Sequence, residues 1–371
     1  MNLGDMRKMQ GSKLLFVSSN LKESKTGAGV CSARNLDASC RVFGFGNVEK
    51  YLLVHFSILN GTFFQKIVRL VNAIWYLLEG YSNGSNRKVD AEIIQKVKKE
   101  KITHVFVDSS LNGRLIQKIK KETHALISVF FHNCEKQMIK EQAKSGNLWA
   151  FLRYLNVWMN EKKTCLYADK IIVLNQRDKD LINRIYGRKA DFIFPISLSD
   201  IVNEDELTCH IVGEKKKGLF VGSYFFGNVE GLTVFIQNVL PYVNMSLTIV
   251  GRGMSKLKID NPNVTIYDGV ESLGPFYDDA DFVIAPILSG GGMKVKIAEA
   301  MMYGKIIIGT PEAFQGYDDI PRSCICRNPH DFVNIINTLS GVSYNQDVRD
   351  CFKKRYETGV LMDQFKNIFK L

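Results

Sequence analysis

Three glycines and two lysines, between residues 290 and 296, have the types and spacing of an anion-binding segment. Gly290, Gly291 and Gly292 let the backbone take unusual conformations, and no side chain keeps a ligand away from their N–H groups. Lys294 and Lys296 add two positive charges next to this loop. The combination suits a phosphate, and its size suits a diphosphate.

Glu299 follows the same loop and further restricts which chemical groups the bound ligand can place there. A carboxylate repels phosphate, so it must face a neutral part of the bound molecule. Sugar hydroxyls are neutral hydrogen-bond donors, and the ribose of a nucleotide is the natural candidate. We therefore expect a nucleoside diphosphate group at residues 290–299.

The flanking sequence predicts the elements that position this loop. Residues 281–287 are apolar and end in a proline, as expected of a buried parallel strand. From about Val295 the apolar residues have helical spacing, and Gly304 stands where a helix needs a left-handed residue. The helix would then point its positive N-terminus at the loop. The alternative is an ordinary glycine-rich turn with surface lysines.

A second candidate site follows another apolar run, residues 125–131, which predicts a strand. His132, Asn133 and Glu135 come directly after it, where parallel sheets gather their ligands. We expect them to contact a ligand at this edge of the sheet. The alternative is a loop histidine that is hydrogen-bonded by the backbone alone.

Weaker candidates follow three other predicted strands, residues 13–18, 218–221 and 247–250. After the first of these strands, Gly27 and Gly29 predict a ligand-binding loop before a helix that begins near residue 30, although an ordinary turn is the alternative. Ser223 follows the second strand, and Arg252 follows the third as a further phosphate ligand, with a solvated loop as the alternative.

The order of strands and helices predicts two doubly wound parallel sheets, each in its own domain. We expect a first domain over residues 1–196, with its second strand at residues 41–45, and a polar linker over 197–217. A second domain over 218–349 would bind the nucleotide. A last helix is expected over residues 350–371, where apolar residues have helical spacing.

Composition narrows the class of protein. An apolar fraction of 46% with 23% charged residues is typical of a globular chain. The net charge of +11 suits nucleic acid, an anionic membrane or anionic substrates, but no base-reading motif is present, so we expect no nucleic-acid partner. The eight cysteines have no zinc spacing, which indicates reduced thiols in the cytoplasm. The polar first twelve residues predict no signal peptide.

Two aromatic helical stretches have open interpretations. Residues 61–80 are apolar around much of their circumference but are interrupted by Lys66 and Arg69, which argues against a membrane span. They predict either a packed helix or an interfacial helix that places Phe63, Phe64, Ile67 and Trp75 on lipid. Residues 149–159 are more often core than lipid-binding.

The residues around the glycine loop resemble the sugar-nucleotide segment of GT-B glycosyltransferases, in particular the retaining family four. The shared residues, in order, are Gly290, Gly292, Lys294, Lys296, Glu299, Ala300 and Gly304, followed by the apolar run 305–310. The resemblance implies that Glu299 holds the ribose and Lys294 the diphosphate. It also implies that the segment from His132 to Glu135 contacts the donor sugar or the acceptor, and that the last helix, over residues 350–371, packs back on the first domain.

Two departures from that family are visible. Many members have a second glutamate eight residues before the first, where this chain has Gly291. Many also have an arginine and a lysine in the first loop of the second domain, and residues 218–230 contain neither. Ser289 and the backbone would have to replace the glutamate, and Lys294 and Lys296 would carry more of the diphosphate charge.

The resemblance implies a GT-B glycosyltransferase that moves a hexosyl group from a UDP- or GDP-linked sugar to a saccharide or lipid-linked hydroxyl. We expect retention of configuration, catalytic roles for His132, Lys294 and Glu299, and no metal or other cofactor. A role in bacterial surface polysaccharide or glycoconjugate synthesis follows, in the cytoplasm or peripherally on the inner membrane face. The alternatives are a non-catalytic partner subunit and a sugar-nucleotide epimerase of the same fold.

Overall fold

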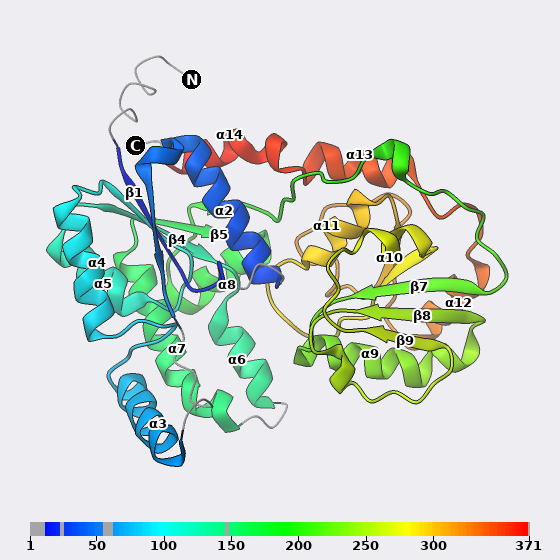
Figure 1. The fold of residues 1–371 in the computed structure, drawn as a ribbon, viewed down its shortest axis with the longest axis horizontal. Helices are drawn as coiled ribbons and strands as arrows, with labels where there is room; N and C mark the ends of the chain where they lie inside the picture. Colours follow the sequence, from blue (N-terminus) through cyan, green and yellow to red (C-terminus); the bar gives the residue numbers. More distant parts are fainter. Residues whose placement is uncertain (1–11, 23–25, 55–61, 145–147, 370–371) are drawn as a thin grey trace. The chain divides into compact units, whose positions relative to one another are not determined.

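The computed structural model describes residues 12–22, 26–54, 62–144 and 148–369, which form two compact units (Figure 1). Unit 1 comprises Met1–Pro195 and Met362–Leu371, and unit 2 comprises Ile196–Leu361. Each unit has one six-stranded sheet with parallel strand pairs, as the order of elements predicted. Nearly all of the first twelve residues, where no signal peptide was expected, lie outside the described residues.

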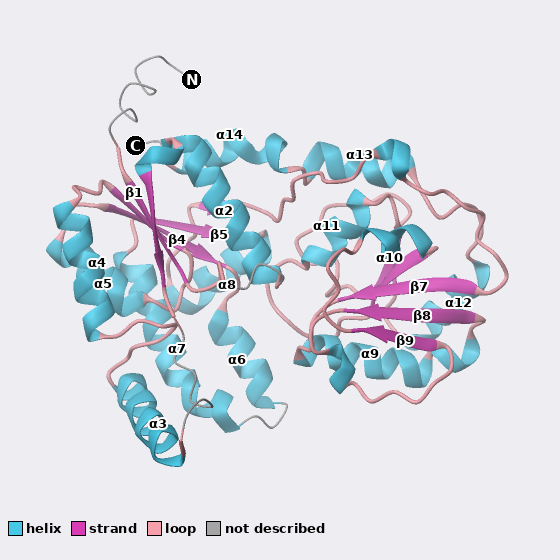
Figure 2. Cartoon of the chain, viewed as in Figure 1, coloured by secondary structure: helices cyan, strands magenta, loops and turns pink. Residues whose placement is uncertain are grey.

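Unit 1 has its strands in the order β2-β1-β3-β4-β5-β6, with helices around the sheet (Figure 2). Its elements are β1 Leu14–Ser18, α2 Gly27–Phe43, a 3-10 turn Phe45–Asn47, β2 Val48–Leu52, α3 Phe63–Leu78, α4 Arg87–Lys99, β3 His104–Val107, α5 Gly113–Glu122, β4 Leu126–Phe131, α6 Glu135–Lys144, α7 Leu148–Tyr167, β5 Lys170–Val173, α8 Gln176–Tyr186 and β6 Phe192–Ile193.

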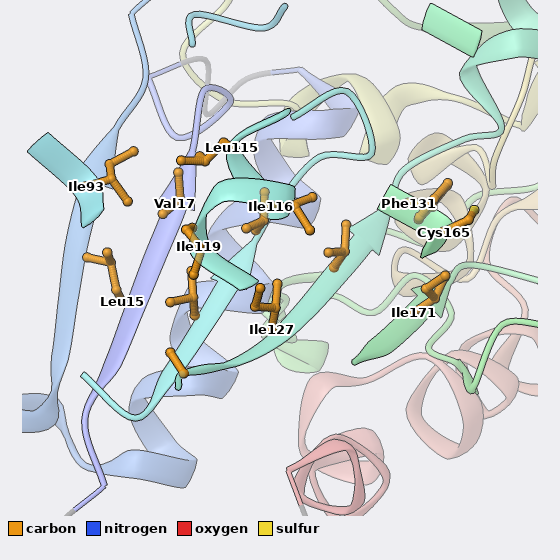
Figure 3. Packing of buried hydrophobic residues seen from close by; sticks show 14 of the residues in the cluster. Leu15, Val17, Ile93, Leu115, Ile116, Ile119, Ile127, Phe131, Cys165 and Ile171 are labelled. Carbon is orange, nitrogen blue, oxygen red and sulfur yellow. The ribbon is translucent and has the colours of Figure 1, made fainter. Parts of the chain in front are cut away.

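One hydrophobic cluster of unit 1 consists mainly of aliphatic side chains between the sheet and its helices (Figure 3). Leu15 and Val17 of β1 and Ile127 of β4 meet Ile116 and Ile119 of α5 there, all with 0–1% exposure. Such continuous apolar strands are expected in a parallel sheet that is covered on both faces. The sheet is therefore a rigid support for the loops at its carboxyl edge.

Unit 2 has the strand order β12-β11-β10-β7-β8-β9. Its elements are a 3-10 turn Glu204–Glu206, β7 Lys216–Val221, α9 Phe226–Asn238, a 3-10 turn Leu240–Tyr242, β8 Met245–Val250, a 3-10 turn Met254–Lys256, β9 Val264–Tyr267, α10 Gly274–Asp279, β10 Phe282–Ala285, α11 Val295–Met302, β11 Ile306–Gly309, β12 Cys324–Ile325, α12 Pro329–Thr338 and α13 Gln346–Arg355. The last helix, α14 Thr358–Ile368, continues from unit 2 into unit 1.

The predicted strand over residues 41–45 is wrong, because α2 continues to Phe43 and the second strand is β2. Phe43 has 4% exposure, and its ring lies 5.2 Å from that of His104 on β3. Gly44, with φ +86°, then ends the helix by donating its N–H to the Cys40 carbonyl. Tertiary packing thus overrides the β-type local sequence.

The predicted single helix over residues 350–371 is also wrong, because α13 and α14 are separate helices. Residues between them pair with the chain near Leu198, whose N–H donates to Tyr356 O at 2.9 Å and whose carbonyl accepts from Thr358 N at 3.0 Å. This strand-like pairing interrupts the helix. Within unit 1, Phe365 and Phe369 of the last segment pack on Phe106 of β3.

Residues 197–217, predicted to be a linker, pack on unit 2. The guanidinium of Arg349, with 1% of its side chain exposed, is paired with Asp200 at 2.8 Å and with Glu204 at 2.9 Å. A buried arginine needs such partners, because an unpaired charge is costly away from water. This pairing fixes the acidic part of the segment.

Candidate functional site

The candidate site of unit 2 lies where the sheet changes winding direction. From β7 the chain goes to β8 and β9 on one side, and then returns to β10 and β11 on the other. In such sheets ligands bind beside the loops that follow the two central strands. Here these loops follow β7 and β10.

The start of α9 packs directly on the loop after β10. A Cβ atom on Gly231 would lie 1.6 Å from the Pro286 carbonyl oxygen, and one on Gly227 would lie 2.4 Å from that of Ser289. Only glycine allows this approach. Ser289 Oγ is also 3.0 Å from Glu230 Oε2, so α9 and the loop after β10 form one continuous surface.

The glycine loop leads into α11 as the sequence predicted. The helix begins at Val295 with Lys294 as its N-cap, and no side chain within the described residues caps it. Gly292, with φ +60°, provides the left-handed turn before it, and Gly304, with φ +62°, follows its end. The positive end of α11 therefore adjoins residues 290–292.

Lys294 is held at the mouth of this loop. Its Nζ lies 2.9 Å from Glu312 Oε1 and 3.0 Å from the Gly291 carbonyl oxygen. Tyr317 donates to the Lys294 carbonyl at 2.8 Å, which fixes the backbone. Glu312, in the loop after β11, was not predicted as a site residue, although its place after a strand was a usable signal.

Lys296 reaches in the other direction, toward the loop after β7. Its Nζ lies 3.0 Å from Asn228 Oδ1 and 3.9 Å from the centre of the Phe220 ring. A Cβ atom on Gly222 would lie 2.8 Å from this ammonium, so Gly222 provides its space. Burial, together with the charge of Lys294, lowers the pKa of Lys296 to about 7.

Glu299 lies one turn further along α11 than Lys296. Burial raises the pKa of its carboxyl to about 7, although the charge of Lys296 acts in the opposite direction. The structure thus brings Lys294, Lys296 and Glu299 together on one loop and helix. Two cations and a carboxylate can hold a diphosphate beside neutral hydroxyls.

Ser223 and Arg252 lie on neighbouring loops of this edge. Tyr224 N donates to the Arg252 carbonyl at 2.9 Å, and a Cβ atom on Gly251 would lie 1.9 Å from the Gly222 carbonyl oxygen. Asn228 donates to the Ser223 carbonyl at 2.8 Å, and it also accepts from Lys296. Ser223 is therefore linked to the lysine through one side chain, while Arg252 is exposed.

In unit 1 the candidate site is built around Asp108, which directly follows β3. Asp108 has 0% exposure, and His132 Nε2 lies 3.1 Å from its Oδ1. Ser18 donates to Asp108 at 2.8 Å, Asn35 does so at 3.2 Å, and Ser32 is a further donor. Asp108 was missed as a site residue, although its position directly after the apolar run of residues 102–107 was a usable signal.

His132 carries a proton at neutral pH because of this neighbour. Burial alone would lower its pKa, but the charge and hydrogen bond of Asp108 raise the pKa to about 10. Asn20 Nδ2 lies 3.4 Å from the same ring nitrogen. The side chain is 11% exposed, so this imidazolium can reach a ligand.

Glu135 begins α6 and is positioned by Glu161, and Asn133 donates to Glu135 Oε1 at 3.3 Å. Both oxygens of Glu161 accept from backbone, from Glu135 N at 2.8 Å and from Lys136 N at 3.0 Å. Tyr186 and Ser110 hold the same carboxylate. No local pattern predicts this role, since Glu161 comes from the distant helix α7.

The predicted glycine loop at Gly27 and Gly29 is wrong in its secondary structure. Both residues lie in the first turn of α2, and Gly29 N donates to the capping Thr26 Oγ1 at 3.1 Å. The helix starts earlier than predicted because Thr26 caps it. The next turn carries Ser32 to Asp108, so this end of α2 still adjoins the His132 cluster.

The comparison of the sequence with known families finds a match in the second unit. Residues 215–340 match the family described as Glycosyl transferases group 1. The match covers about a third of the chain and lies within unit 2. The matched residues include Ser223, Arg252, the glycine loop with its two lysines, Glu299 and Glu312.

Solved structures similar to the whole chain share its fold and confirm the predicted GT-B architecture. HepE of Anabaena, solved with UDP-glucose, has a TM-score of 0.65 at 12% identity, with 96% of this chain and 98% of HepE covered. Sucrose-phosphate synthase of Thermosynechococcus elongatus has 0.66 at 12%, and the galactosyltransferase WaaB of the lipopolysaccharide outer core has 0.59 at 14%, both with coverages of 96% and 98%.

One curated relative matches part of the chain. An uncharacterized 44.6 kDa protein in the cps region of Klebsiella pneumoniae is 30% identical over 115 residues. The match covers 26% of this chain, and the chain spans only 30% of the length of that relative.

Proposed function

We propose that the chain transfers a hexosyl group from a nucleoside diphosphate sugar to a hydroxyl of a saccharide or lipid-linked acceptor. One observation carries this proposal: the loop after β10 and the helix α11 present Lys294, Lys296 and Glu299 together at the switch point of the sheet. The family match over the same residues supports it.

Each of these residues has a proposed role. The backbone of residues 290–292 and Lys294 hold the diphosphate and stabilise the charge that develops on it when the sugar leaves. Lys296 supports the same phosphates from the β7 side. Glu299 accepts hydrogen bonds from the ribose hydroxyls. In this scheme the lysines, rather than a metal ion, take up the charge, so the rate should be unchanged by EDTA.

His132 acts as a hydrogen-bond donor in this proposal. An imidazolium with a pKa of about 10 cannot accept a proton at neutral pH, which argues against the base that an inverting transfer requires. It can donate to a sugar hydroxyl or to the leaving phosphate. We therefore propose retention of configuration, with Asn133 and Glu135 near the sugar or acceptor.

The relatives suggest which substrates to test first. HepE was solved with UDP-glucose, which supports a uridine nucleotide. The Klebsiella relative lies in a cps region, which supports a role in surface polysaccharide synthesis. The eight cysteines are free thiols in the structure, which suits a reducing cytoplasm.

Donor turnover is the decisive experiment. Purified chain is incubated with a panel of UDP- and GDP-linked hexoses, with and without saccharide and lipid-linked acceptors, and release of nucleoside diphosphate is measured. We expect release from one donor and its loss in the Lys294→Ala variant. Binding of a nucleotide without release from any donor would make the chain a non-catalytic partner subunit. Conversion of one sugar nucleotide into another would make it an epimerase.

A further inference from the structure

The helix α3 of unit 1 has an exposed apolar face. Seven large side chains lie outward at helical spacing, among them Phe64, Trp75 and Leu78 with exposures of 74%, 62% and 73%. The complete set is Phe64, Ile67, Val68, Val71, Ile74, Trp75 and Leu78. Their spacing forms one continuous stripe along a helix, since they occupy positions i, i+3, i+4, i+7, i+10, i+11 and i+14.

The opposite side and the end of α3 fix this orientation. Ala73, Tyr76 and Leu77 are half-buried, and the Leu77 carbonyl accepts from Asn156 of α7 at 2.8 Å. A capping box of Thr62 and Gln65 fixes the first turn. Figure 1 shows α3 at the margin of unit 1, beside α7. The stripe is thus a fixed outer surface of the unit.

The charges of the two units differ in sign. Unit 1 has 34 basic and 18 acidic residues, a net charge of +16, whereas unit 2 has 15 basic and 20 acidic residues, a net charge of −5. The whole chain's excess of +11 therefore belongs to the unit that carries α3. Residues 51–78 contain two basic residues, Lys66 and Arg69, and no acidic one. A partner that is both apolar and anionic would suit the stripe and the basic unit that carries it.

We propose that α3 docks unit 1 on the surface of an anionic lipid bilayer, with the stripe from Phe64 to Leu78 in the interfacial region. A bilayer supplies acyl chains for the stripe and anionic headgroups for the basic unit. Trp75 suits the headgroup boundary. This proposal goes beyond the glycosyl transfer and does not depend on it.

Two other occupants fit less well. A second copy of the chain would bring two units of charge +16 together, which opposes association. Nucleic acid would match the charge but would leave the aliphatic stripe exposed to water. Within the described residues, no helix has the length and hydropathy needed to cross a membrane. The helix would therefore lie along the surface.

The sequence had left this helix with two interpretations, and the exposed stripe favours the interfacial one. Phe64, Ile67 and Trp75, which were expected to contact lipid in that case, all lie on the stripe. The side chain of Phe63 lies outside the described side chains.

Vesicle flotation of the full chain tests the proposal. The vesicles are phosphatidylcholine alone or phosphatidylcholine with about 30% phosphatidylglycerol, at low salt. A triple variant, Phe64→Ser, Trp75→Ser and Leu78→Ser, is compared with a control, Ile201→Ser, Ile211→Ser and Tyr242→Ser. The control changes three unit 2 residues that are similarly exposed, at 75%, 82% and 68%.

We expect wild type and control to float with anionic vesicles, and the triple variant to lose roughly tenfold or more of its bound fraction. Brominated acyl chains should quench wild-type tryptophan fluorescence, and Trp75→Phe should remove most of that quenching. Equal binding by the triple variant would overturn the proposal. Equal binding to neutral vesicles would overturn its anionic part. A wild-type dimer that the triple variant abolishes, without vesicle binding, would assign the stripe to a second copy.

Discussion

Lys294 and Glu312 form an ion pair at the mouth of the glycine loop, with Nζ 2.9 Å from Oε1. The two side chains are 13% and 21% exposed, so water screens the pair only in part. A diphosphate bound at this loop would compete with Glu312 for the same ammonium. The acidic partner thus holds the lysine in place and weakens its attraction for the ligand.

Replacing this partner should strengthen nucleotide binding. We expect Glu312→Gln to lower the Kd for UDP or GDP by roughly three- to tenfold, because the amide cannot neutralise the lysine. Isothermal titration at low and high salt measures this, with Glu271→Gln, an exposed glutamate of the same unit, as the control. A weaker complex would mean that Glu312 itself contacts the nucleotide.

The two lysines should differ in their effect on the rate. Lys294→Ala should lower kcat/KM by roughly a hundredfold, because it removes charge stabilisation of the leaving group. Lys296→Ala should cost on the order of tenfold, since its ammonium supports the phosphates from the β7 side. Steady-state rates at saturating acceptor compare them, with the exposed Lys258→Ala as control. Equal losses would indicate a single shared clamp.

Loss of the carboxylate of Glu299 should weaken nucleotide binding without unfolding the domain. Two charge-assisted bonds to ribose hydroxyls are worth on the order of 2 to 4 kcal/mol, so Glu299→Ala should raise the Kd roughly 30- to 1000-fold. Titration with UDP and with 2′,3′-dideoxy-UDP separates the ribose contribution, since the variant should no longer distinguish the two ligands. Unchanged UDP affinity would refute the ribose assignment.

The unliganded protein should gain stability when Lys296 becomes neutral. Its folded-state pKa of about 7 lies below the ordinary 10.5, so between these values the unfolded chain binds more protons and stability rises with pH. Lys296→Met should therefore raise Tm at pH 7, and the gain should shrink toward pH 10. Thermal melts from pH 6 to 10 measure it. A gain that is constant over this range would show that burial does not disfavour the charged form.

Asp108 should determine the pH range of the proposed transfer reaction. With the His132 pKa raised to about 10, the imidazolium persists across neutral pH and is lost only as pH rises through about 10. In Asp108→Asn burial still lowers that pKa, so the rate should fall as pH rises through about 6.5 or below. Rate profiles of both proteins, with His132→Gln as the reference for a missing ring, test this. Parallel profiles would limit Asp108 to a structural role.

Local sequence patterns were sufficient where the residues that form a strand, loop or helix also include the residues proposed to bind the ligand. The strand before Pro286, the glycine loop and the helix that begins at Val295 are all where the sequence placed them. In this segment the apolar periodicity, the glycine conformations and the start of the helix all depend on residues that are adjacent in the sequence. The same holds for β4, which ends at Phe131 just before His132.

Long-range contacts account for what the sequence did not indicate. The end of α2 at Phe43 is helical because its ring packs on β3 and on Phe369. The roles of Asp108, Glu161 and Glu312 depend on partners that are 18 to 90 residues away in the sequence, from Lys294 for Glu312 to Ser18 for Asp108. A single sequence gives the identity of such acids but not their neighbours.

The path of α14 has a consequence for the order in which the protein folds. Unit 1 is discontinuous: Phe365 and Phe369 complete its aromatic cluster with Phe106 and Phe194, and Lys170 donates to the Ile368 carbonyl at 2.6 Å. The ribosome must synthesise all of unit 2 before these residues emerge. Until then, one apolar face of the first 195 residues stays uncovered. Unit 2 can therefore reach its native state before unit 1 does during translation.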